Sequence, residues 1–310
     1  MRARWIGALV TVVVLLGAGA GLAALRRTGA PTGLEVVVAA VGDMACSASS
    51  APDGQSIDGP ALCVHGAVSD AVIAARPSVL LALGDMQYED GAPGAWDPYD
   101  RTYGRLRAIT RPVPGNHEYL TPGATGYFSY FGDLAGPAER GYYGFAIGSW
   151  YGVALNSECS DVGGCGDSSP QVAWLRRELA EHPARCTLAY WHIPRFSSGH
   201  HGDHDSYATF WRVLTEYGVD VVLNGHDHNY ERFAPLTADG VRDDNNGIRS
   251  FVVGTGGRNL RPAHAPREGS ERLIDDTFGF LALKLRGDGY TWSFVSIDGA
   301  MLDGGEDRCH

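Results

Sequence analysis

Five short stretches of the chain carry side chains that bind metal ions in proteins, and each stands at the end of an expected strand. They are Gly42-Asp43, Gly84-Asp85, Gly115-Asn116-His117-Glu118, Trp191-His192 and Gly225-His226-Asp227-His228. One such stretch alone is typical of a turn or a packed histidine. Five of them in succession indicate a shared site, because in open α/β sheets sites gather beyond the carboxyl ends of the strands. A glycine before the ligand lets the backbone turn sharply and approach closely.

The donor groups in these stretches indicate two metal ions rather than one. Carboxylate, amide and imidazole groups without a thiolate favour Fe, Mn or Zn over Ca²⁺. Six side chains exceed the needs of one open catalytic ion, and they suit two ions about 3.5–4 Å apart that share a carboxylate and a water. Such a pair holds a phosphoryl group and stabilises charge on the attacking and leaving oxygens. The six side chains are Asp43, Asp85, Asn116, His192, His226 and His228.

The elements that must position these groups alternate between strand and helix along the chain. Apolar, β-branched runs predict strands over 35–41, 78–84, 186–192 and 219–225, and a hairpin over 142–156. Helical spacing predicts helices over 65–75, 98–109, 170–182 and 206–218, with Ser169 as a cap before Pro170 and Gly218 at an end. Further strands are expected over 250–257, 280–286 and 291–297. This order predicts an α/β sheet with parallel pairing first and an antiparallel portion after it.

The order of the motifs GD, GDxxY, GNHE, WH and GHDH, over residues 41–233, resembles the calcineurin-like metallophosphoesterases. Many members of that superfamily carry a histidine where this chain has Ala45, which removes one ligand. The purple acid phosphatase branch replaces it with the tyrosine of GDxxY, and "GDMQY" places Tyr88 at that position. A phenolate favours Fe(III). The resemblance implies a two-sheet β-sandwich flanked by helices, in four layers of α/β/β/α.

The resemblance also implies the role of each residue. One metal, expected to be Fe(III), would take Asp43, Asp85, Tyr88 and His228, and the second, Fe, Zn or Mn, would take Asp85, Asn116, His192 and His226. Asp85 would bridge the two ions. His117 would face the phosphoryl group of the substrate, as would the pair His200 and His201. Glu118 and Asp227 are expected to support the ligands rather than to bind metal.

The activity that this resemblance implies is hydrolysis of small phosphate monoesters by attack of metal-bound hydroxide on phosphorus. His117, with His200 or His201, would stabilise the phosphoryl oxygens and assist the leaving alkoxide. A phosphodiesterase or nucleotide phosphohydrolase on the same metals is the alternative, because the shared motifs do not separate these enzymes. A remote alternative is a non-catalytic cell-surface binding protein. Such a protein would be expected to lack some of the metal-binding residues, whereas all seven are present.

The N-terminus and the cysteines indicate an exported protein. A basic start, an uncharged apolar run over 5–25 and two following arginines predict that residues 1–33 are a signal peptide or a membrane anchor with a short linker. The catalytic domain is then expected over 34–310, in a secreted or extracytoplasmic location. Six cysteines allow 15 pairings. We favour Cys46–Cys63 and Cys159–Cys165, which close short loops, and this leaves Cys186–Cys309.

Composition limits the partners of the chain. The 310 residues carry a formal net charge of −11, and Lys284 is the single lysine. An acidic chain without a basic stripe is a poor match for long nucleic acid, so no nucleic-acid partner is expected. A membrane contact is expected only through the N-terminal segment, and the sequence does not specify an oligomeric state.

Overall fold

The computed structural model describes residues 1, 35–46, 55–56, 59–60, 63–137 and 139–310. The signal peptide or anchor predicted for residues 1–33 lies outside the described residues, apart from Met1. Within the described residues, no helix combines the length and the hydropathy that crossing a bilayer requires.

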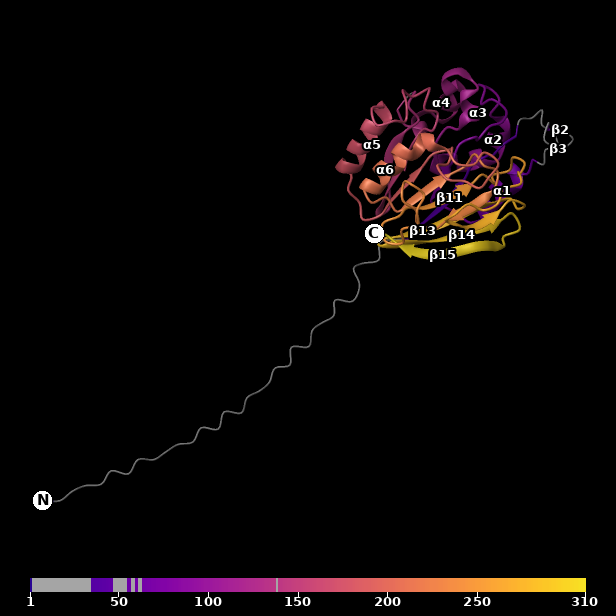
Figure 1. The fold of residues 1–310 in the computed structure, drawn as a ribbon. Helices are drawn as coiled ribbons and strands as arrows, with labels where there is room; N and C mark the ends of the chain where they lie inside the picture. Colours follow the sequence, from indigo (N-terminus) through magenta and orange to yellow (C-terminus); the bar gives the residue numbers. More distant parts are fainter. Residues whose placement is uncertain (2–34, 47–54, 57–58, 61–62, 138) are drawn as a thin grey trace. The chain divides into compact units, whose positions relative to one another are not determined.

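The first of two mixed sheets has the strand order β15-β14-β13-β1-β4-β5. Its parallel half comes first in the sequence and contains β1 (Val36–Val41), β4 (Val79–Ala82) and β5 (Thr110–Pro112). Its antiparallel half contains β13 (Gly279–Arg286), β14 (Gly289–Ser296) and β15 (Met301–Arg308), which lie side by side in Figure 1. The predicted succession of parallel and antiparallel pairing is therefore present within this sheet.

The second sheet has the order β12-β10-β11-β9-β8-β7-β6. Its parallel strands are β7 (Trp150–Ala154), β8 (Thr187–Tyr190), β9 (Val221–Asn224) and β11 (Arg249–Val253). The antiparallel strands are β6 (Tyr143–Ile147), β10 (Tyr230–Phe233) and β12 (Ser270–Ile274). A separate two-stranded ladder joins β2 (Gln55–Ser56) to β3 (Gly59–Pro60).

Helices cover the outer faces of both sheets. The α-helices are α1 (His65–Ala74), α2 (Asp97–Arg101), α3 (Asn116–Tyr119), α4 (Thr125–Phe131), α5 (Pro170–Glu181) and α6 (Ala208–Glu216). The 3₁₀-helices are η1 (Tyr103–Ile109), η2 (Pro122–Ala124), η3 (Gly132–Ala135) and η4 (Asp205–Tyr207). The Ser169 cap is present, since its Oγ accepts a hydrogen bond from Val172 N at 3.3 Å. The helix predicted over 98–109 is instead split at Thr102, whose hydroxyl bonds back to the carbonyls of Pro98 and Tyr99.

Three apolar cores separate four layers. The central core joins the two sheets, for example Ala40 and Leu81 from the first to Leu223 from the second. The second core packs α5 and α6 on the outer face of the second sheet, and the third packs α1, α2, η1 and α4 on the outer face of the first. Strands buried on both faces in this way need continuous apolar runs such as "VVVAAV" in β1. The predicted α/β/β/α sandwich is confirmed.

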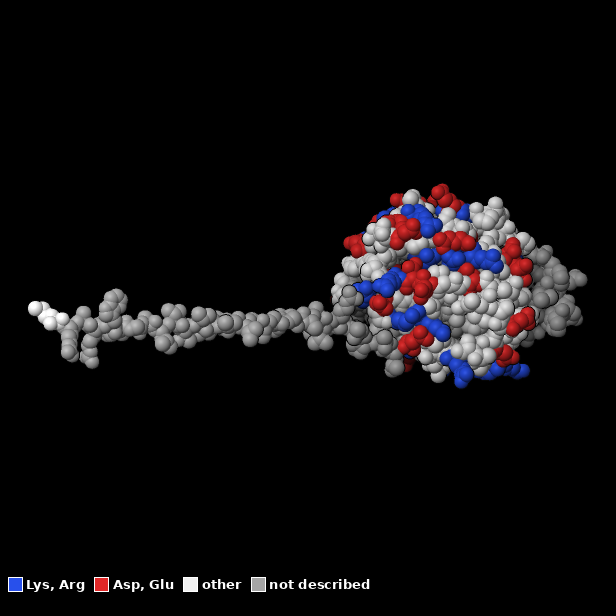
Figure 2. All heavy atoms as spheres, turned by 90° about the horizontal axis from the view of Figure 1, so that it is seen from below, with Lys and Arg blue, Asp and Glu red and all other residues white. Residues whose placement is uncertain are grey.

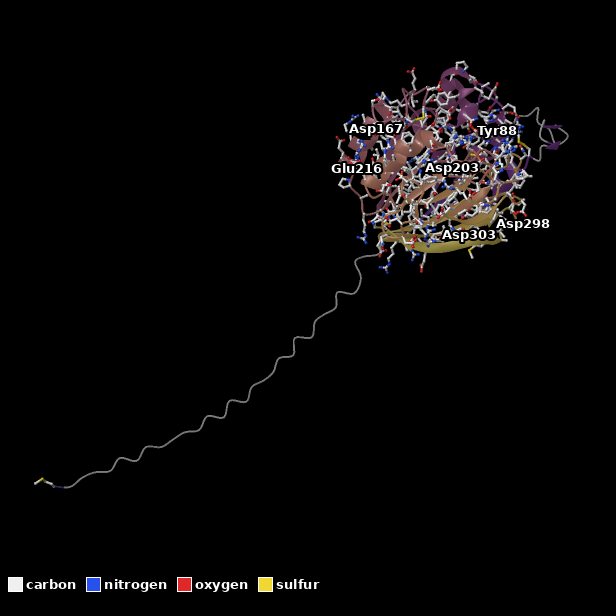
Figure 3. All side chains as sticks on the ribbon, viewed as in Figure 1. Tyr88, Asp167, Asp203, Glu216, Asp298 and Asp303 are labelled. Atoms are coloured by element: carbon white, nitrogen blue, oxygen red, sulfur yellow. A yellow bond between two sulfur atoms is a disulfide. The ribbon has the colours of Figure 1, made fainter. Side chains whose placement is uncertain are left out.

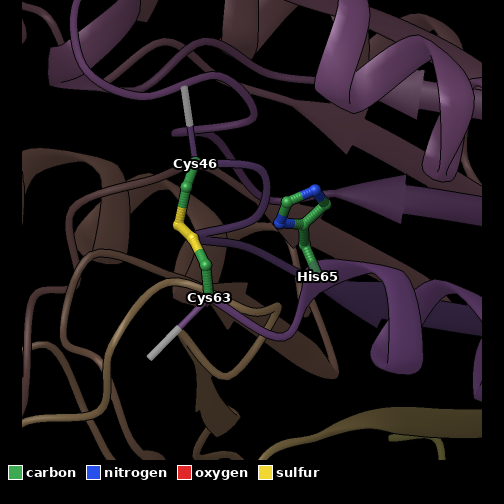
Figure 4. A group of neighbouring side chains, drawn as sticks. All are labelled: Cys46, Cys63 and His65. Atoms are coloured by element: carbon green, nitrogen blue, oxygen red, sulfur yellow. A yellow bond between two sulfur atoms is a disulfide. The ribbon is translucent and has the colours of Figure 1, made fainter. Parts of the chain in front are cut away.

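The three favoured disulfides, Cys46–Cys63, Cys159–Cys165 and Cys186–Cys309, are all formed. Figure 4 shows the imidazole of His65 beside the first of them. Because the two sulfur atoms are bonded to each other, this group offers no thiolate to a metal ion. Basic and acidic side chains are intermixed on the face shown in Figure 2, in line with the absence of a basic stripe from the sequence.

Candidate metal centre

The site begins where three strands end in tight turns. Asp43, Asp85 and His226 follow β1, β4 and β9, and all three have left-handed backbones, with φ of 59°, 48° and 72°. Side-chain-bearing residues adopt this conformation only where the surroundings impose it, and such residues cluster at functional sites. Here the first two turns hold each other, since Asp43 N donates to Gly84 O at 3.1 Å and Met44 N to Asp85 O at 2.8 Å.

Two glycines give the carboxylates the space that they occupy. A Cβ atom at Gly115 would overlap Asp85 Oδ1, and one at Gly225 would lie 2.8 Å from Asp43 Oδ2. The glycines that precede Asn116 and His226 are therefore required by close approach of the backbone to the neighbouring carboxylate.

Four of the predicted ligands converge around the hydroxyl of Tyr88, which is labelled in Figure 3. This hydroxyl lies 2.9 Å from Asp43 Oδ1, 3.0 Å from Asp85 Oδ2 and 3.1 Å from His228 Nε2. His228 Nε2 lies 3.3 Å from Asp43 Oδ1. All four side chains are buried. They are the four residues that the sequence assigned to one metal.

The other predicted ligands meet at His192. Its Nε2 lies 3.2 Å from Asp85 Oδ2, 3.1 Å from Asn116 Oδ1 and 3.3 Å from His226 Nδ1. One carboxylate oxygen, Asp85 Oδ2, thus belongs to both clusters. The structure brings all seven predicted metal ligands into two adjoining groups with Asp85 between them.

Hydrogen bonds behind the clusters orient the ligand atoms. His192 Nδ1 lies 2.8 Å from Leu83 O, and His228 Nδ1 lies 2.6 Å from Asn259 O. A carbonyl oxygen only accepts, so Nδ1 carries the proton and Nε2 faces the cluster. The second oxygen of each carboxylate accepts a backbone hydrogen bond. His117 N donates to Asp85 Oδ1 at 2.9 Å, and His226 N donates to Asp43 Oδ2 at 2.8 Å. This set of oxygen and nitrogen atoms, from five buried side chains and the half-buried Asn116 and His226, is backed by oriented bonds and fits metal ions.

Burial and mutual charge shift the pKa values of these groups in the metal-free protein. Burial works against ionisation of Asp85, but the imidazoles of His192 and His117 hold its pKa well below the usual range. Burial also works against protonation of His192, yet Asp85 outweighs it and raises the pKa of His192 to about 10. Burial, with Asp43 and Asp85, raises the pKa of Tyr88 well above 10. Metal binding through these atoms must therefore displace protons.

Glu118 supports the site through hydrogen bonds to the backbone, and it is not one of the side chains of the two clusters. Its carboxylate, which is fully buried, accepts N–H bonds from Gly115 at 2.7 Å, Met86 at 2.8 Å, Asp85 at 3.0 Å and Gln87 at 3.3 Å. The GNHE and GDMQY motifs are thus tied together by one side chain. Burial and the charge of Asp85 raise the pKa of Glu118 to about 8.

The three predicted substrate-facing histidines are not equivalent. His117 Nε2 lies 3.9 Å from Asp85 Oδ2, its ring lies 4.3 Å from that of Tyr88, and its side chain is 24% exposed. The ring of His201 lies 4.2 Å from that of His226. His200 and His201 are both exposed, and the ring of His200 lies 5.2 Å from that of His201 and 6.4 Å from that of His264. The structure therefore brings the rings of His117 and His201 to the clusters, whereas the ring of His200 contacts those of His201 and His264.

Sequence reasoning missed four residues beside the clusters. The guanidinium of Arg258 lies 5.0 Å from the centre of the Tyr88 ring, and Arg261 Nη1 lies 3.1 Å from His201 Nε2. Asn259 contributes the carbonyl that orients His228, and the ring of His204 lies 5.7 Å from that of His226. The three residues 258, 259 and 261 come from the loop between β11 and β12. That loop has no periodic pattern, and its arginines were the only available signal.

A family model described as calcineurin-like phosphoesterase matches residues 38–230, a stretch that contains every motif of the two clusters. The chain belongs to this family. Purple acid phosphatase 21 of Arabidopsis thaliana is 29% identical over 197 residues, covering 58% of this chain and 44% of the relative. A protein named nucleotide pyrophosphatase/phosphodiesterase from Hordeum vulgare is 28% identical over 217 residues, covering 59% of this chain and 58% of the relative.

Among solved structures, a purple acid phosphatase from yellow lupin seeds superposes with a TM-score of 0.73 at 19% identity. The match covers 88% of this chain and 53% of the lupin chain, and it shows the shared fold. This chain spans about half the length of the purple acid phosphatases that it matches. The predicted family and the predicted likeness to purple acid phosphatases are confirmed.

Proposed function

We propose that this protein is a metal-dependent phosphatase that hydrolyses small phosphate monoesters. The observation that carries the proposal is the position of Asp85, because one of its oxygens lies 3.0 Å from the Tyr88 hydroxyl and 3.2 Å from His192 Nε2. A carboxylate shared between two buried donor groups is the arrangement that a pair of metal ions requires.

The residues that would hold the ions are those of the two clusters. Asp43, Tyr88 and His228 would hold one ion, Asn116, His192 and His226 the other, and Asp85 both. When bound, the ions would supply a nucleophilic water at neutral pH and neutralise charge on the phosphoryl oxygens. The phenol of Tyr88 supports Fe(III) at the first site, and Fe, Zn or Mn suits the second.

Side chains around the clusters would bind the substrate and move a proton. His117 Nδ1 is bonded to Glu89 O, so the ring is held with Nε2 on the side of Asp85. From there a protonated His117 can donate to a phosphoryl or leaving-group oxygen. His201, beside His226, and the guanidinium of Arg261 next to it provide further donors for the phosphoryl oxygens.

The test is hydrolysis of an aryl phosphate by wild-type protein and by Asp85→Ala. We expect the variant to retain less than about a tenth of the wild-type kcat, since a tenfold loss of rate corresponds to only about 1.4 kcal/mol of barrier. Asp167→Ala is the matched control, because Asp167 is 65% exposed and pairs with two surface arginines, Arg176 and Arg212. Retention of more than about a tenth of the wild-type kcat by Asp85→Ala would exclude the two-metal mechanism.

A phosphodiesterase or nucleotide phosphohydrolase on the same site is the second candidate. The likeness to the Hordeum vulgare protein, whose name carries both activities, favours it. Parallel assays with an aryl phosphate, a bis-aryl phosphate and a nucleoside diphosphate separate the candidates. Monoester hydrolysis is expected to have the highest kcat/KM of the three.

We further propose that the catalytic domain, residues 34–310, acts outside the cytoplasm after export directed by residues 1–33. Three disulfides within the described residues support an oxidising location. Mass analysis of the mature protein, in the membrane and soluble fractions of the producing cell, distinguishes a cleaved signal peptide from an anchor formed by residues 5–25. Recovery of the chain from the cytoplasm alone would contradict export.

A further inference from the structure

Residues 197–201, here called the histidine loop, contain His200 and His201 and lie beside the cluster formed by Asp85, Asn116, His192 and His226. The loop is bonded to two carboxylates that come from the segment bearing His226 and His228. These are Asp227 and Glu231, and both side chains are 0% exposed. Burying a carboxylate is costly unless hydrogen bonds compensate for lost water, so the contacts of these two groups define their role.

Asp227 holds both ends of the histidine loop. Its Oδ2 accepts the hydroxyl of Ser197, and its Oδ1 accepts His201 N at 2.8 Å. The Ser197 hydroxyl in turn accepts Gly199 N at 2.9 Å. A Cβ atom at Gly199 would overlap the carboxylate, so the loop is wrapped closely around it. Asp227 therefore links the turn that carries two expected metal ligands to the backbone of His201.

Glu231 holds the middle of the same loop. Its Oε2 accepts Ser198 N at 2.7 Å, and its Oε1 accepts the hydroxyls of Ser198 and Ser270, each at 2.6 Å. The Ser198 hydroxyl also accepts Arg267 N at 2.9 Å. Hydrogen bonds to a charged acceptor are about twice as strong as neutral ones, so these bonds hold the loop firmly.

The bond from His201 N to Asp227 fixes the backbone at the histidine whose ring lies beside His226. With that N–H fixed, the His201 ring lies 4.2 Å from the His226 ring, while the adjacent His200 ring lies 5.2 Å from the His201 ring and 6.4 Å from that of His264. If the loop were released, either histidine could occupy the position beside His226.

We propose that Asp227 and Glu231 are positioning residues that hold the histidine loop so that His201, and not His200, contacts the phosphoryl group. This inference rests on the proposed phosphatase function. It predicts non-additive effects on kcat/KM, because substitutions of residues that act through His201 should have no effect when the His201 imidazole is absent.

The test is a double-mutant cycle on kcat/KM for an aryl phosphate, with metal content measured for every variant. Asp227→Asn and Glu231→Gln each keep the side-chain shape, and Asp167→Asn is the exposed control. We expect both variants to retain two metal ions and to lower kcat/KM by about 10-fold or more in the wild-type background. In the His201→Ala background they should lower it by less than about twofold. His201→Ala should cost more than His200→Ala.

The outcomes separate the inference from the function on which it rests. Wild-type protein that does not hydrolyse the ester refutes the proposed function. Active wild-type protein with additive effects in the cycle refutes the positioning role, because the carboxylates then act independently of His201. Loss of metal from both carboxylate variants also overturns it, since it assigns them to the metal centre itself. A larger effect of His200→Ala than of His201→Ala reverses the assignment of the histidines.

Discussion

Glu118→Gln is the substitution that most sharply tests how the site is held together. The wild-type carboxylate accepts four backbone N–H groups, two on each oxygen: Asp85 and Gly115 on Oε2, Met86 and Gln87 on Oε1. Glutamine has the same shape but offers only one acceptor oxygen. Whichever way its amide is turned, the –NH₂ group faces two buried N–H donors, which then lack a partner.

The magnitude follows from those two donors. A buried donor left without an acceptor costs about 1–3 kcal/mol, so the pair costs about 2–6 kcal/mol. That is a large part of the total stability of a folded domain, about 5–15 kcal/mol. In either orientation the turn that carries Asp85 loses a hydrogen bond, at Asp85 N or at Met86 N, so metal affinity should fall along with stability.

The assay is guanidinium chloride unfolding of chelator-treated protein at about pH 9. This pH lies above the pKa of Glu118, about 8, so the wild-type carboxylate is ionised and all four N–H groups have an acceptor. Because that pKa is raised on folding, ionisation itself costs the wild-type protein stability, and we expect the measured difference near the lower end of the range, about 2 kcal/mol. Glu181→Gln, an exposed substitution at the end of α5, is the control and should stay within about 0.5 kcal/mol of wild type. If the unfolding free energy of Glu118→Gln lies within about 1 kcal/mol of the wild-type value, the four hydrogen bonds of Glu118 do not hold the site together.

Three other predictions concern single side chains. Iron-loaded wild-type protein should show a broad visible absorption band from phenolate bound to Fe(III), and Tyr88→Phe should lose this band. If wild-type protein that is shown to hold Fe(III) has no such band, Tyr88 is not a ligand. His117→Ala should keep both metals and lower kcat by roughly 10²–10⁴-fold, so that loss of a metal from this variant would contradict its placement outside the ligand set. A hydrogen bond to Asp220 raises the pKa of His310, so its stabilising contribution is complete below about pH 6.5 and is lost as the pH rises through the raised value. His310→Gln should therefore destabilise the protein more at about pH 5.5 than at about pH 9, and equal effects on unfolding free energy would contradict this.

The positions of the expected ligands could be predicted because each one follows a strand. The carboxyl ends of parallel strands meet at one edge, so Asp43 and Asp85 had to lie close together once β1 and β4 paired in parallel. Tyr88 could be placed by its spacing from Asp85 and by the missing histidine at position 45. The positions of Asp43 and Asp85 need only the order of apolar runs and polar ends, which the sequence displays directly, whereas the role of Tyr88 is what the resemblance to purple acid phosphatases implies.

Other parts of the site depend on contacts that residue types do not reveal. The acceptor that orients His228 is the backbone carbonyl of Asn259, and any residue at that position carries one. The proposed difference between His200 and His201 depends on the hydrogen bond that the backbone N–H of His201 donates to Asp227. The break at Thr102 arises from its hydroxyl bonding to nearby carbonyls, which competes with continued helix. Each of these is decided by tertiary packing rather than by local pattern.

The central claim is that the two clusters are one binuclear metal centre with Asp85 between the ions. Anomalous diffraction from a crystal of metal-loaded protein tests it most directly. The account predicts two peaks about 3.5–4 Å apart on either side of Asp85, one against Tyr88 and His228 and the other against His192 and His226. A single peak, or peaks away from these side chains, would contradict it.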